Sequence, residues 1–329
     1  MNLFENYRNG KVDLRTRLVL PPMATAKSSP GGYMTSELCD YYEQRAAGGK
    51  LGLIITEHAY ISMKGKASAN QMSMASDDVI PGLQKLTDII HKYDVKVISQ
   101  INHAGSASMQ SITGSPIISA SAILNPGRKA GLADEIPQAL TVEQIKEVEK
   151  EFVDAAIRVK KAGFDGVEIH SAHGYFLNQF YSPLTNKRTD EYGVDCMENR
   201  LRIHREILAQ VKEAVGDDFL IAMRLGGCDY MEGGSRIDDA VEAAKMLEKA
   251  SVELLDLSGG MCRFTRPGHE EAGYFADLSA AVKKAVSIPV ILTGGVKRVA
   301  EAEALLAADK ADLIGVGRAF MQNAAWGND

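Results

Sequence analysis

Residues 289–318 read PVILTGGVKRVAEAEALLAADKADLIGVGR and carry the clearest structural signal in the chain. Two short apolar runs, Pro289–Thr293 and Leu313–Val316, enclose a longer run with helical spacing, Val299–Ala308. Near-continuous apolar runs of this length are typical of parallel strands that are buried on both faces. The stretch therefore predicts a strand, a helix and a second strand parallel to the first.

The same alternation of short apolar runs and longer amphipathic runs extends back toward the N-terminus. Further strands are expected at Arg17–Ala24, Leu51–Glu57, Val95–Ile101, Gly166–His170, Phe219–Leu225 and Leu254–Ser258. Further helices are expected at Ser36–Ala47, Val79–Tyr93, Thr141–Ala162, Glu198–Val215, Ile237–Ala250, Phe275–Val286 and, after the last strand, Ala319–Ala325. Eight strands alternating with helices predict an α/β fold, the (β/α)8 or TIM barrel, and we expect residues 1–329 to form one such domain.

A doubly wound sheet is the rival arrangement, because it also alternates strands with helices. Such a sheet usually has a GxGxxG turn after its first strand. Here the first expected strand continues into PPMATAKSSPGG, which lacks that motif. Simple division of 329 residues by the size of an average domain would favour two domains. Barrels of ~250 residues or more nevertheless fold as single domains.

The composition is that of a globular protein, with 45% hydrophobic and 24% charged residues. A net charge of −6 argues against non-specific binding of nucleic acid. The four cysteines form no CxxC pair, so neither a structural zinc site nor an iron–sulfur cluster is expected. No apolar stretch approaches the ~18 residues of a membrane span, and the first residues do not resemble a signal peptide. We therefore expect a cytoplasmic protein that binds neither nucleic acid nor membranes.

Two long insertions interrupt the alternation, at residues 102–140 and 171–197. Each follows an expected strand, so each should lie at the C-terminal rim of the barrel, where the active sites of such barrels lie. Long loops in a compact domain usually serve a function. The insertions are therefore expected to surround the site.

Glycine-rich turns end the last two strands, as Thr293-Gly294-Gly295 and as Gly315-Val-Gly317-Arg318. Glycine lets backbone N–H groups approach an anion closely, and an arginine guanidinium can bind a phosphate in a bidentate manner. Barrel enzymes often bind phosphate at this corner. The turns therefore predict a phosphate site, although tight turns between strand and helix also require glycine.

Two histidines and a tyrosine follow the fourth strand in the sequence His170-Ser-Ala-His173-Gly-Tyr175. Two imidazoles at a rim can bind one small anion or one carbonyl oxygen. Tyr175, with an ordinary pKa of ~10, would stay protonated and could donate a proton. A metal site is the less favoured interpretation, because no nearby carboxylate is spaced to complete it. Histidines that are only core residues are the remaining alternative.

Polar residues interrupt two otherwise apolar strands, as Gln100 in VKVISQINHAG and as Arg224 in FLIAMRLGG. A charge at the C-terminal end of a barrel strand faces the site or needs a partner, because burial without one is costly. Each side chain could hydrogen-bond a ring system with several acceptors. For Arg224 the alternative is a salt bridge to a strand carboxylate such as Glu168.

In combination these motifs resemble the old yellow enzyme family of FMN-dependent oxidoreductases, the NADH:flavin oxidoreductases. The resemblance extends from about Leu3 to Phe320. Its motifs, in chain order, are Pro21-Pro-Met23, Tyr42-Glu-Gln-Arg-Ala46, Gln100-Ile-Asn-His-Ala-Gly105, Ala162-Gly-Phe-Asp-Gly-Val-Glu-Ile-His170, His173-Gly-Tyr175, Ser182-Pro183, Arg188-Thr-Asp-Glu-Tyr-Gly193, Asn199-Arg200, Arg224, Thr293-Gly-Gly295 and Gly317-Arg318.

The resemblance implies a (β/α)8 barrel that binds FMN at its C-terminal mouth. The isoalloxazine ring would be contacted by Pro21, Pro22, Met23, Ala24, Gln100, Arg224 and, through its backbone, His58. The phosphate would be held by Gly294, Gly295, Gly317 and Arg318. His170 and His173 would bind the carbonyl oxygen of the substrate, and Tyr175 would be the proton donor.

The activity that the resemblance implies is that of an ene-reductase. NADH or NADPH, as a diffusible reductant, would reduce FMN, which would then reduce the activated C=C bond of an α,β-unsaturated carbonyl compound. Arg224 would stabilise the anionic reduced flavin. The natural enone-type substrate, the choice between NADH and NADPH and a homo-oligomeric state are left open.

The sequence also departs from the family pattern. Ala24 stands where members often carry Thr or Cys, so the flavin potential is expected to differ. Relatives that reduce 2,4-dienoyl-CoA continue into an iron–sulfur segment and a second dinucleotide domain, whereas this sequence ends at Asp329 without a cysteine cluster. We therefore expect the short, FMN-only form with no iron–sulfur cluster.

Three alternatives remain. The chain could be a barrel module of a larger dienoyl-CoA-reductase-like enzyme. It could be a flavin-free barrel lyase or isomerase that acts on a phosphorylated substrate, although no lysine at a strand end is placed to form a Schiff base. It could also be a flavin-binding protein that has lost turnover.

Overall fold

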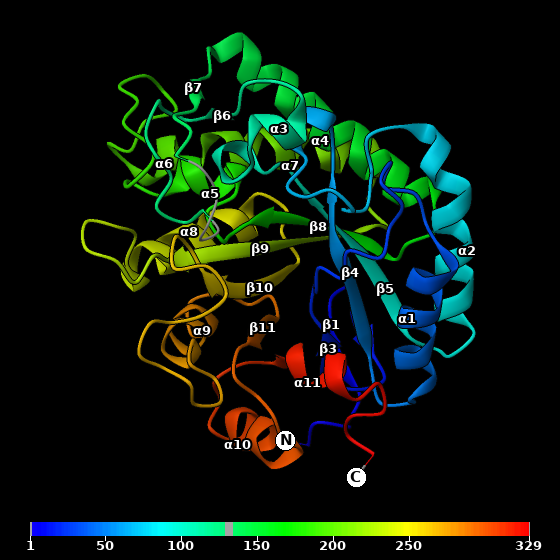
Figure 1. Cartoon of the computed structure of the whole chain (residues 1–329). Helices are drawn as coiled ribbons and strands as arrows, with labels where there is room; N and C mark the ends of the chain where they lie inside the picture. Colours follow the sequence, from blue (N-terminus) through cyan, green and yellow to red (C-terminus); the bar gives the residue numbers. More distant parts are fainter. Residues whose placement is uncertain (1, 129–133, 329) are drawn as a thin grey trace.

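Eight parallel strands close into a barrel in the computed structural model of the chain, which describes residues 2–128 and 134–328 (Figure 1). The predicted barrel is therefore confirmed, with each expected strand in the closed sheet. In order along the chain the strands are β3 (Leu18–Leu20), β4 (Leu53–Tyr60), β5 (Lys96–Asn102), β8 (Gly166–Ser171), β9 (Leu220–Cys228), β10 (Leu254–Gly259), β11 (Val290–Thr293) and β12 (Leu313–Gly315). The first strand is shorter than predicted, since Pro21 lacks the N–H that would continue the ladder.

Helices surround the barrel between successive strands (Figure 1). They are α1 (Ser36–Ala47), α2 (Ile80–His91), α4 (Val142–Lys161), α6 (Met197–Arg200), α7 (Arg202–Val215), α8 (Ile237–Lys249), α9 (Ala276–Lys283), α10 (Val299–Ala307) and α11 (Arg318–Gln322). The start of α4 confirms the capping box between Thr141 and Gln144. The single helix predicted over Glu198–Val215 is divided at Leu201, where the backbone leaves helical geometry.

An N-terminal hairpin that the sequence did not predict covers the end of the barrel at which the strands begin. Its strands β1 (Tyr7–Asn9) and β2 (Val12–Leu14) pair in antiparallel fashion. Tyr7, Val12 and Leu14 pack in one buried cluster with the lowest inward-facing layer of the barrel: Val19, Leu53, Ile55, Ile98, Leu220, Ala222, Leu254, Ile291 and Leu313. Apolar side chains thus fill the interior of the barrel at this end, and the larger cavity lies at the opposite mouth.

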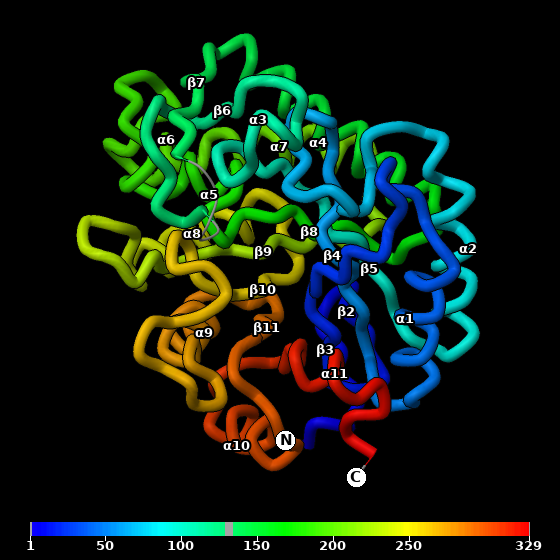
Figure 2. The backbone as a smooth tube through the Cα atoms, in the orientation of Figure 1, coloured from blue at the N-terminus to red at the C-terminus, as the bar shows by residue number. Residues whose placement is uncertain are grey.

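The two predicted insertions lie beyond the C-terminal ends of the strands, at the upper edge of the tube drawing (Figure 2). The first carries α3 (Gln110–Thr113) and a small parallel pair, β6 (Ile118–Ser119) with β7 (Gln138–Ala139), and its residues 129–133 lie outside the described part. The second carries the buried helix α5 (Phe176–Tyr181). Three short 3-10 helices, η1 (Met63–Gly65), η2 (Asp77–Val79) and η3 (Gly105–Ala107), complete the elements. Among the described residues, no helix is long and apolar enough to cross a membrane.

Candidate active site

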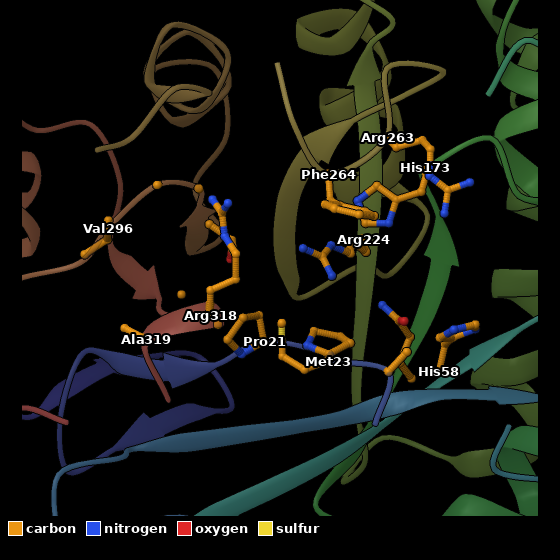
Figure 3. Close-up of a pocket in the computed structure, with 18 of the residues that line it drawn as sticks. Pro21, Met23, His58, His173, Arg224, Arg263, Phe264, Val296, Arg318 and Ala319 are labelled. Atoms are coloured by element: carbon orange, nitrogen blue, oxygen red, sulfur yellow. The ribbon is translucent and has the colours of Figure 1, made fainter. Parts of the chain in front are cut away.

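A cavity of about 620 Å³ opens at the C-terminal mouth of the barrel, and all the predicted site residues line it. Figure 3 shows Arg318 and Val296 on one side, His58 and His173 on the other, and Arg224 between them. The predicted residues that the structure brings together here are Pro21, Pro22, Met23, Ala24, His58, Gln100, His170, His173, Tyr175, Arg224, Gly294, Gly295, Gly317 and Arg318. The size lies within the ~300–1,000 Å³ that small-molecule and cofactor sites occupy.

The floor of the cavity is a polar layer contributed by the middle of the barrel strands. Because strand side chains alternate in direction, Gln100, Glu168, Arg224 and Asp256 all stand above the apolar layer that the hairpin covers. Gln100 Nε2 donates to Glu168 Oε1 at 2.7 Å. Arg224 Nε lies 3.0 Å from Asp256 Oδ2 as an ion pair. The alternative of a salt bridge from Arg224 to a strand carboxylate is thus found, with Asp256 as the partner in place of the example Glu168, because β10, which carries Asp256, pairs with β9 at that register.

Two acids therefore face one guanidinium in a fully buried layer. Burial raises the pKa of the Asp256 carboxyl to about 6, although the positive charge of Arg224 opposes the rise. Burial also raises the pKa of the Glu168 carboxyl well above its ordinary value, and the negative charge of Asp256 adds to the effect. Carboxyls with raised pKa values bind protons near neutral pH, so this layer can hold the Arg224 charge without two full negative charges beside it.

Four rings form one end of the cavity: His58, His170, His173 and Tyr175. The His170 ring centroid lies 5.0 Å from that of His173 and 5.1 Å from that of Tyr175. The His173 backbone has φ of 62°, a left-handed conformation that non-glycine residues rarely adopt and that clusters at functional sites. His173 Nε2 lies 2.8 Å from Ser258 Oγ, which fixes the orientation of the ring.

The rings are uncharged near neutral pH. Burial, together with the nearby charge of Arg224, lowers the pKa values of His170 and His173 well below the ordinary value. Each neutral imidazole keeps one N–H to donate. Burial raises the pKa of the Tyr175 phenol, and the charge and hydrogen bond of Arg263 oppose that rise. The cluster is thus a set of neutral donors, which suits a carbonyl oxygen that becomes negative during a reaction.

The opposite end of the cavity is formed by the two glycine turns. They lie next to each other because β11 and β12, whose ends they follow, are paired strands. Gly295 has φ of +71°, and a Cβ there would stand 2.2 Å from the Glu271 carbonyl oxygen. Lys297 and Arg318 bring positive charge to the same end of the lining. Backbone amides and two cations at one end match the requirements of a phosphate group.

Sequence reasoning missed the segment that follows β10, which covers the ring cluster. Arg263 Nη1 donates to the Gly127 carbonyl oxygen at 3.0 Å and so connects this segment to the first insertion. The Phe264 ring centroid lies 6.0 Å from that of His173, and its side chain is 55% exposed at the mouth (Figure 3). The available signal was the pair Arg263 and Arg266 just after a glycine-rich strand end, which places cations at the rim.

A metal centre finds no support in this geometry. Within residues 2–128 and 134–328, no group of three or more His, Cys, Asp or Glu side chains could hold a metal ion. His170 Nδ1 is buried without a hydrogen-bond partner, and no carboxylate reaches it. The unpartnered His170 Nδ1 therefore remains available for a hydrogen bond to a ligand in the cavity.

The comparison with known families covers almost the whole chain. Residues 2–328 match the model of the NADH:flavin oxidoreductase / NADH oxidase family. The chain belongs to this family. The members, as the name of the family states, are oxidoreductases that act between NADH and a flavin, so the resemblance drawn from the motifs is confirmed at the level of the family.

Individual relatives agree with this assignment. The chain is 38% identical over 331 residues to an NADH oxidase of Thermoanaerobacter brockii, which covers 99% of this chain and 50% of that protein. It is 38% identical over 325 residues to an NADPH dehydrogenase of Halalkalibacterium halodurans, and this match covers 98% of this chain and 92% of that protein. The chain thus spans about half the length of the first relative and nearly all of the second.

The fold is that of the old yellow enzymes. The solved structure of an old yellow enzyme homologue from Zymomonas mobilis matches with a TM-score of 0.85 at 27% sequence identity. The match covers 98% of this chain and 90% of that one. The family that was inferred from the motifs therefore has the same barrel architecture as this chain.

Proposed function

We propose that the protein is an FMN-dependent oxidoreductase that uses NADH or NADPH to reduce the activated C=C bond of α,β-unsaturated carbonyl compounds. The observation that carries the proposal is one cavity with three neutral donors, His170, His173 and Tyr175, at one end and a glycine-lined cationic site at the other. Between them lies Arg224, the only arginine of the buried polar floor among the described residues. A flavin phosphate at one end would place a ring system over this floor and under the donors.

The residues present fit FMN. The Gly294–Gly295 and Gly317–Arg318 turns would hold the phosphate, and the segment from Pro21 to Ala24 would line one side of the ring. Residues that line the cavity also carry buried polar atoms without a hydrogen-bond partner, among them Thr293 Oγ1 and His170 Nδ1. Buried donors and acceptors of this kind need a partner, and a flavin ring offers both. When bound, FMN supplies the carrier that accepts and returns a hydride.

The protein's own groups would perform the remaining tasks. His170 and His173 would donate to the substrate carbonyl oxygen and stabilise the negative charge that develops on it. Tyr175 would donate its phenolic proton to the carbon next to that carbonyl, and Arg263 would stabilise the resulting phenolate through its charge. Phe264 would cover the donors against bulk water. Arg224 would favour a negative charge on a ring above the floor.

A single substitution tests the phosphate end of this site. Gly295→Ala should weaken FMN binding by about 10–100-fold. The added Cβ would strain the backbone and press against the Glu271 carbonyl oxygen, so the turn would shift, and holding it in the binding conformation would cost about 1–3 kcal/mol. The dissociation constant is measured by the quenching of FMN fluorescence. Gly114→Ala is the matched control, since Gly114 has a similar φ of +70° but nothing within 4 Å of the added Cβ. Equal FMN affinity of both variants would contradict the assignment.

The proposed activity itself is tested on the purified protein. Incubation with FMN should give a yellow protein whose flavin absorbance is bleached by NADH or NADPH without oxygen and restored by an enone. Titration with each nucleotide and with several enones would identify the preferred reductant and acceptor. A protein that takes up no FMN, or whose bleached form no enone reoxidises, would disprove the proposal.

Two of the alternatives predict other results. A flavin-free lyase or isomerase would bind a phosphorylated substrate at the glycine turns and would gain nothing from FMN. A barrel module of a larger enzyme would still bind FMN, but would receive its electrons through other domains and so react slowly with free NADH and NADPH.

We further propose the single FMN-binding barrel domain, the absence of an iron–sulfur cluster, a cytoplasmic location and a possible homo-oligomer, as the sequence predicts.

A further inference from the structure

The imidazole of His58 has a place in the cavity that the proposed function does not use. His58 lies on β4, and its ring lines the cavity beside the proposed proton donor. The ring centroid lies 5.3 Å from that of Tyr175 and 6.2 Å from that of His170. The side chain therefore belongs to the group of rings that would receive the substrate, and Figure 3 shows it on the same side of the cavity as His173.

The tautomer of His58 follows from its neighbour Gln71. The backbone N–H of Ala67 donates to Gln71 Oε1 at 2.6 Å, and an N–H can only donate, so this contact fixes which end of the amide is oxygen. Gln71 Nε2 then lies 3.1 Å from the His58 carbonyl oxygen and 2.9 Å from His58 Nδ1. Asn102 Nδ2 lies 3.2 Å from the same Nδ1. Because Gln71 Nε2 can only donate, Nδ1 is the acceptor of the ring.

The proton of the ring must therefore be on Nε2. Burial, with the charges of Arg263 and Arg224, lowers the pKa of His58 to about 4, so the ring carries a single proton near neutral pH. The ring contacts of His58 involve Nδ1, and among the described residues none forms a hydrogen bond with Nε2. Since the ring lines the cavity and Nδ1 faces Gln71 and Asn102, the Nε2–H is left for a ligand.

We propose that His58 is a substrate-binding residue whose Nε2–H binds a second acceptor oxygen of the substrate. With His170 and His173 binding the first carbonyl, the pocket would favour α,β-unsaturated compounds that carry two carbonyl oxygens, such as cyclic imides, over monoketones and lactams. The inference rests on the proposed function, because it assumes that the first oxygen lies at His170 and His173. A substrate with one oxygen would leave the His58 donor without a partner.

Two unreactive ligands that differ by one oxygen test this inference on the FMN-loaded protein. N-methylsuccinimide has two carbonyl groups and N-methyl-2-pyrrolidinone has one. Their dissociation constants are measured from changes in the flavin absorbance of the oxidised protein. The wild type should bind the imide about tenfold more tightly, which is the effect of one neutral hydrogen bond. His58→Leu should remove this preference, and His58→Gln, which keeps an N–H donor, should retain most of it.

Turnover gives the second arm, with N-methylmaleimide against 1-methyl-1,5-dihydropyrrol-2-one. The ratio of their kcat/KM values should fall about tenfold in His58→Leu relative to the wild type. An equal change for both compounds in His58→Leu, or no imide preference in the wild-type dissociation constants, would overturn the role of His58. If the wild type reduces neither compound but binds the imide preferentially, the proposed function fails while the His58 donor stands.

The tautomer can be examined independently of any ligand. Nitrogen-15 NMR of histidine-labelled protein should show an unprotonated Nδ1 and a protonated Nε2 for His58, identified by the signal that is lost in His58→Gln. The opposite tautomer would leave Nε2 as an acceptor and overturn the inference. Thermal unfolding of both variants checks that the loss of the Asn102 and Gln71 contacts has not unfolded the site.

Discussion

Tyr175→Phe is expected to slow the reduction of an enone by the NADPH-reduced protein by about 10²–10⁴-fold, the usual contribution of a positioned proton donor. The substitution removes only the hydroxyl. The ring remains to pack against His58 and His170, whose centroids lie 5.3 and 5.1 Å away. The reduction of bound FMN by NADPH, which needs no proton from Tyr175, should change by less than about threefold. Stopped-flow absorbance measures the two half-reactions separately.

The pH dependence gives this prediction a second readout. Because burial raises the pKa of Tyr175, the phenol stays protonated and the enone half-reaction of the wild type should not fall between pH 6 and about 9. In Tyr175→Phe the proton must come from solvent, so small buffer acids should restore part of the rate, and more at lower pH. If Tyr175→Phe slows both half-reactions equally, or if added acids do not raise its rate of enone reduction, Tyr175 is not the proton donor.

The central part of the site was predictable because it lies on strands. A strand places alternate side chains on the same side, and Gln100, His170 and Arg224 stand out as polar residues in apolar runs. Once the barrel was recognised, their meeting at one mouth followed from geometry. The partner of Arg224 could not be predicted in the same way. The choice between Glu168 and Asp256 depends on the register of β9 against β10 and on the tilt of the strands, which the sequence alone does not determine.

The loops and the ends of the barrel were less predictable. Arg263 reaches the ring cluster only through the path of the segment after β10 and its bond to Gly127, and loop paths depend on contacts between distant residues. The hairpin of β1 and β2 did carry a local signal, since glycine is favoured at the first position of a two-residue hairpin turn and Gly10 occupies it with φ of 56°. Its strands of three residues each were too short to recognise by periodicity. His58 was predicted through its backbone, and only the contacts of Gln71 and Asn102 reveal its imidazole as a donor.

Arg224→Met should lower the stability of the flavin-free protein strongly at alkaline pH and little at acidic pH. Arg224 is the cation beside the buried carboxyls of Asp256 and Glu168. Breaking a buried ion pair by removing one partner costs about 3–5 kcal/mol, because the remaining charge is left in a medium of low polarity. The acids can avoid this cost by binding protons, so the cost depends on pH.

The direction of this pH dependence of stability follows from the pKa of Asp256, which is about 6 in the folded protein against ~3.9 in an unfolded chain. A carboxyl with a raised folded pKa stabilises the protein most at low pH, and that stability is lost as the pH rises through the folded pKa. Without Arg224 the folded pKa rises further, so the loss continues to higher pH. Urea unfolding of the variant and the wild type should therefore agree within about 1 kcal/mol at pH 5 and differ by about 3 kcal/mol at pH 8.5.

A double variant separates charge from packing in this prediction. Arg224→Met combined with Asp256→Asn removes one of the two buried acids, so its loss of stability between pH 5 and pH 8.5 should be less than that of Arg224→Met alone. Glu168 remains and keeps part of the pH dependence, since its pKa is also raised. A loss of equal size at both pH values in Arg224→Met would mean that the arginine stabilises the barrel by packing. The buried floor would then not be the charge-balanced layer that the proposed function assigns to it.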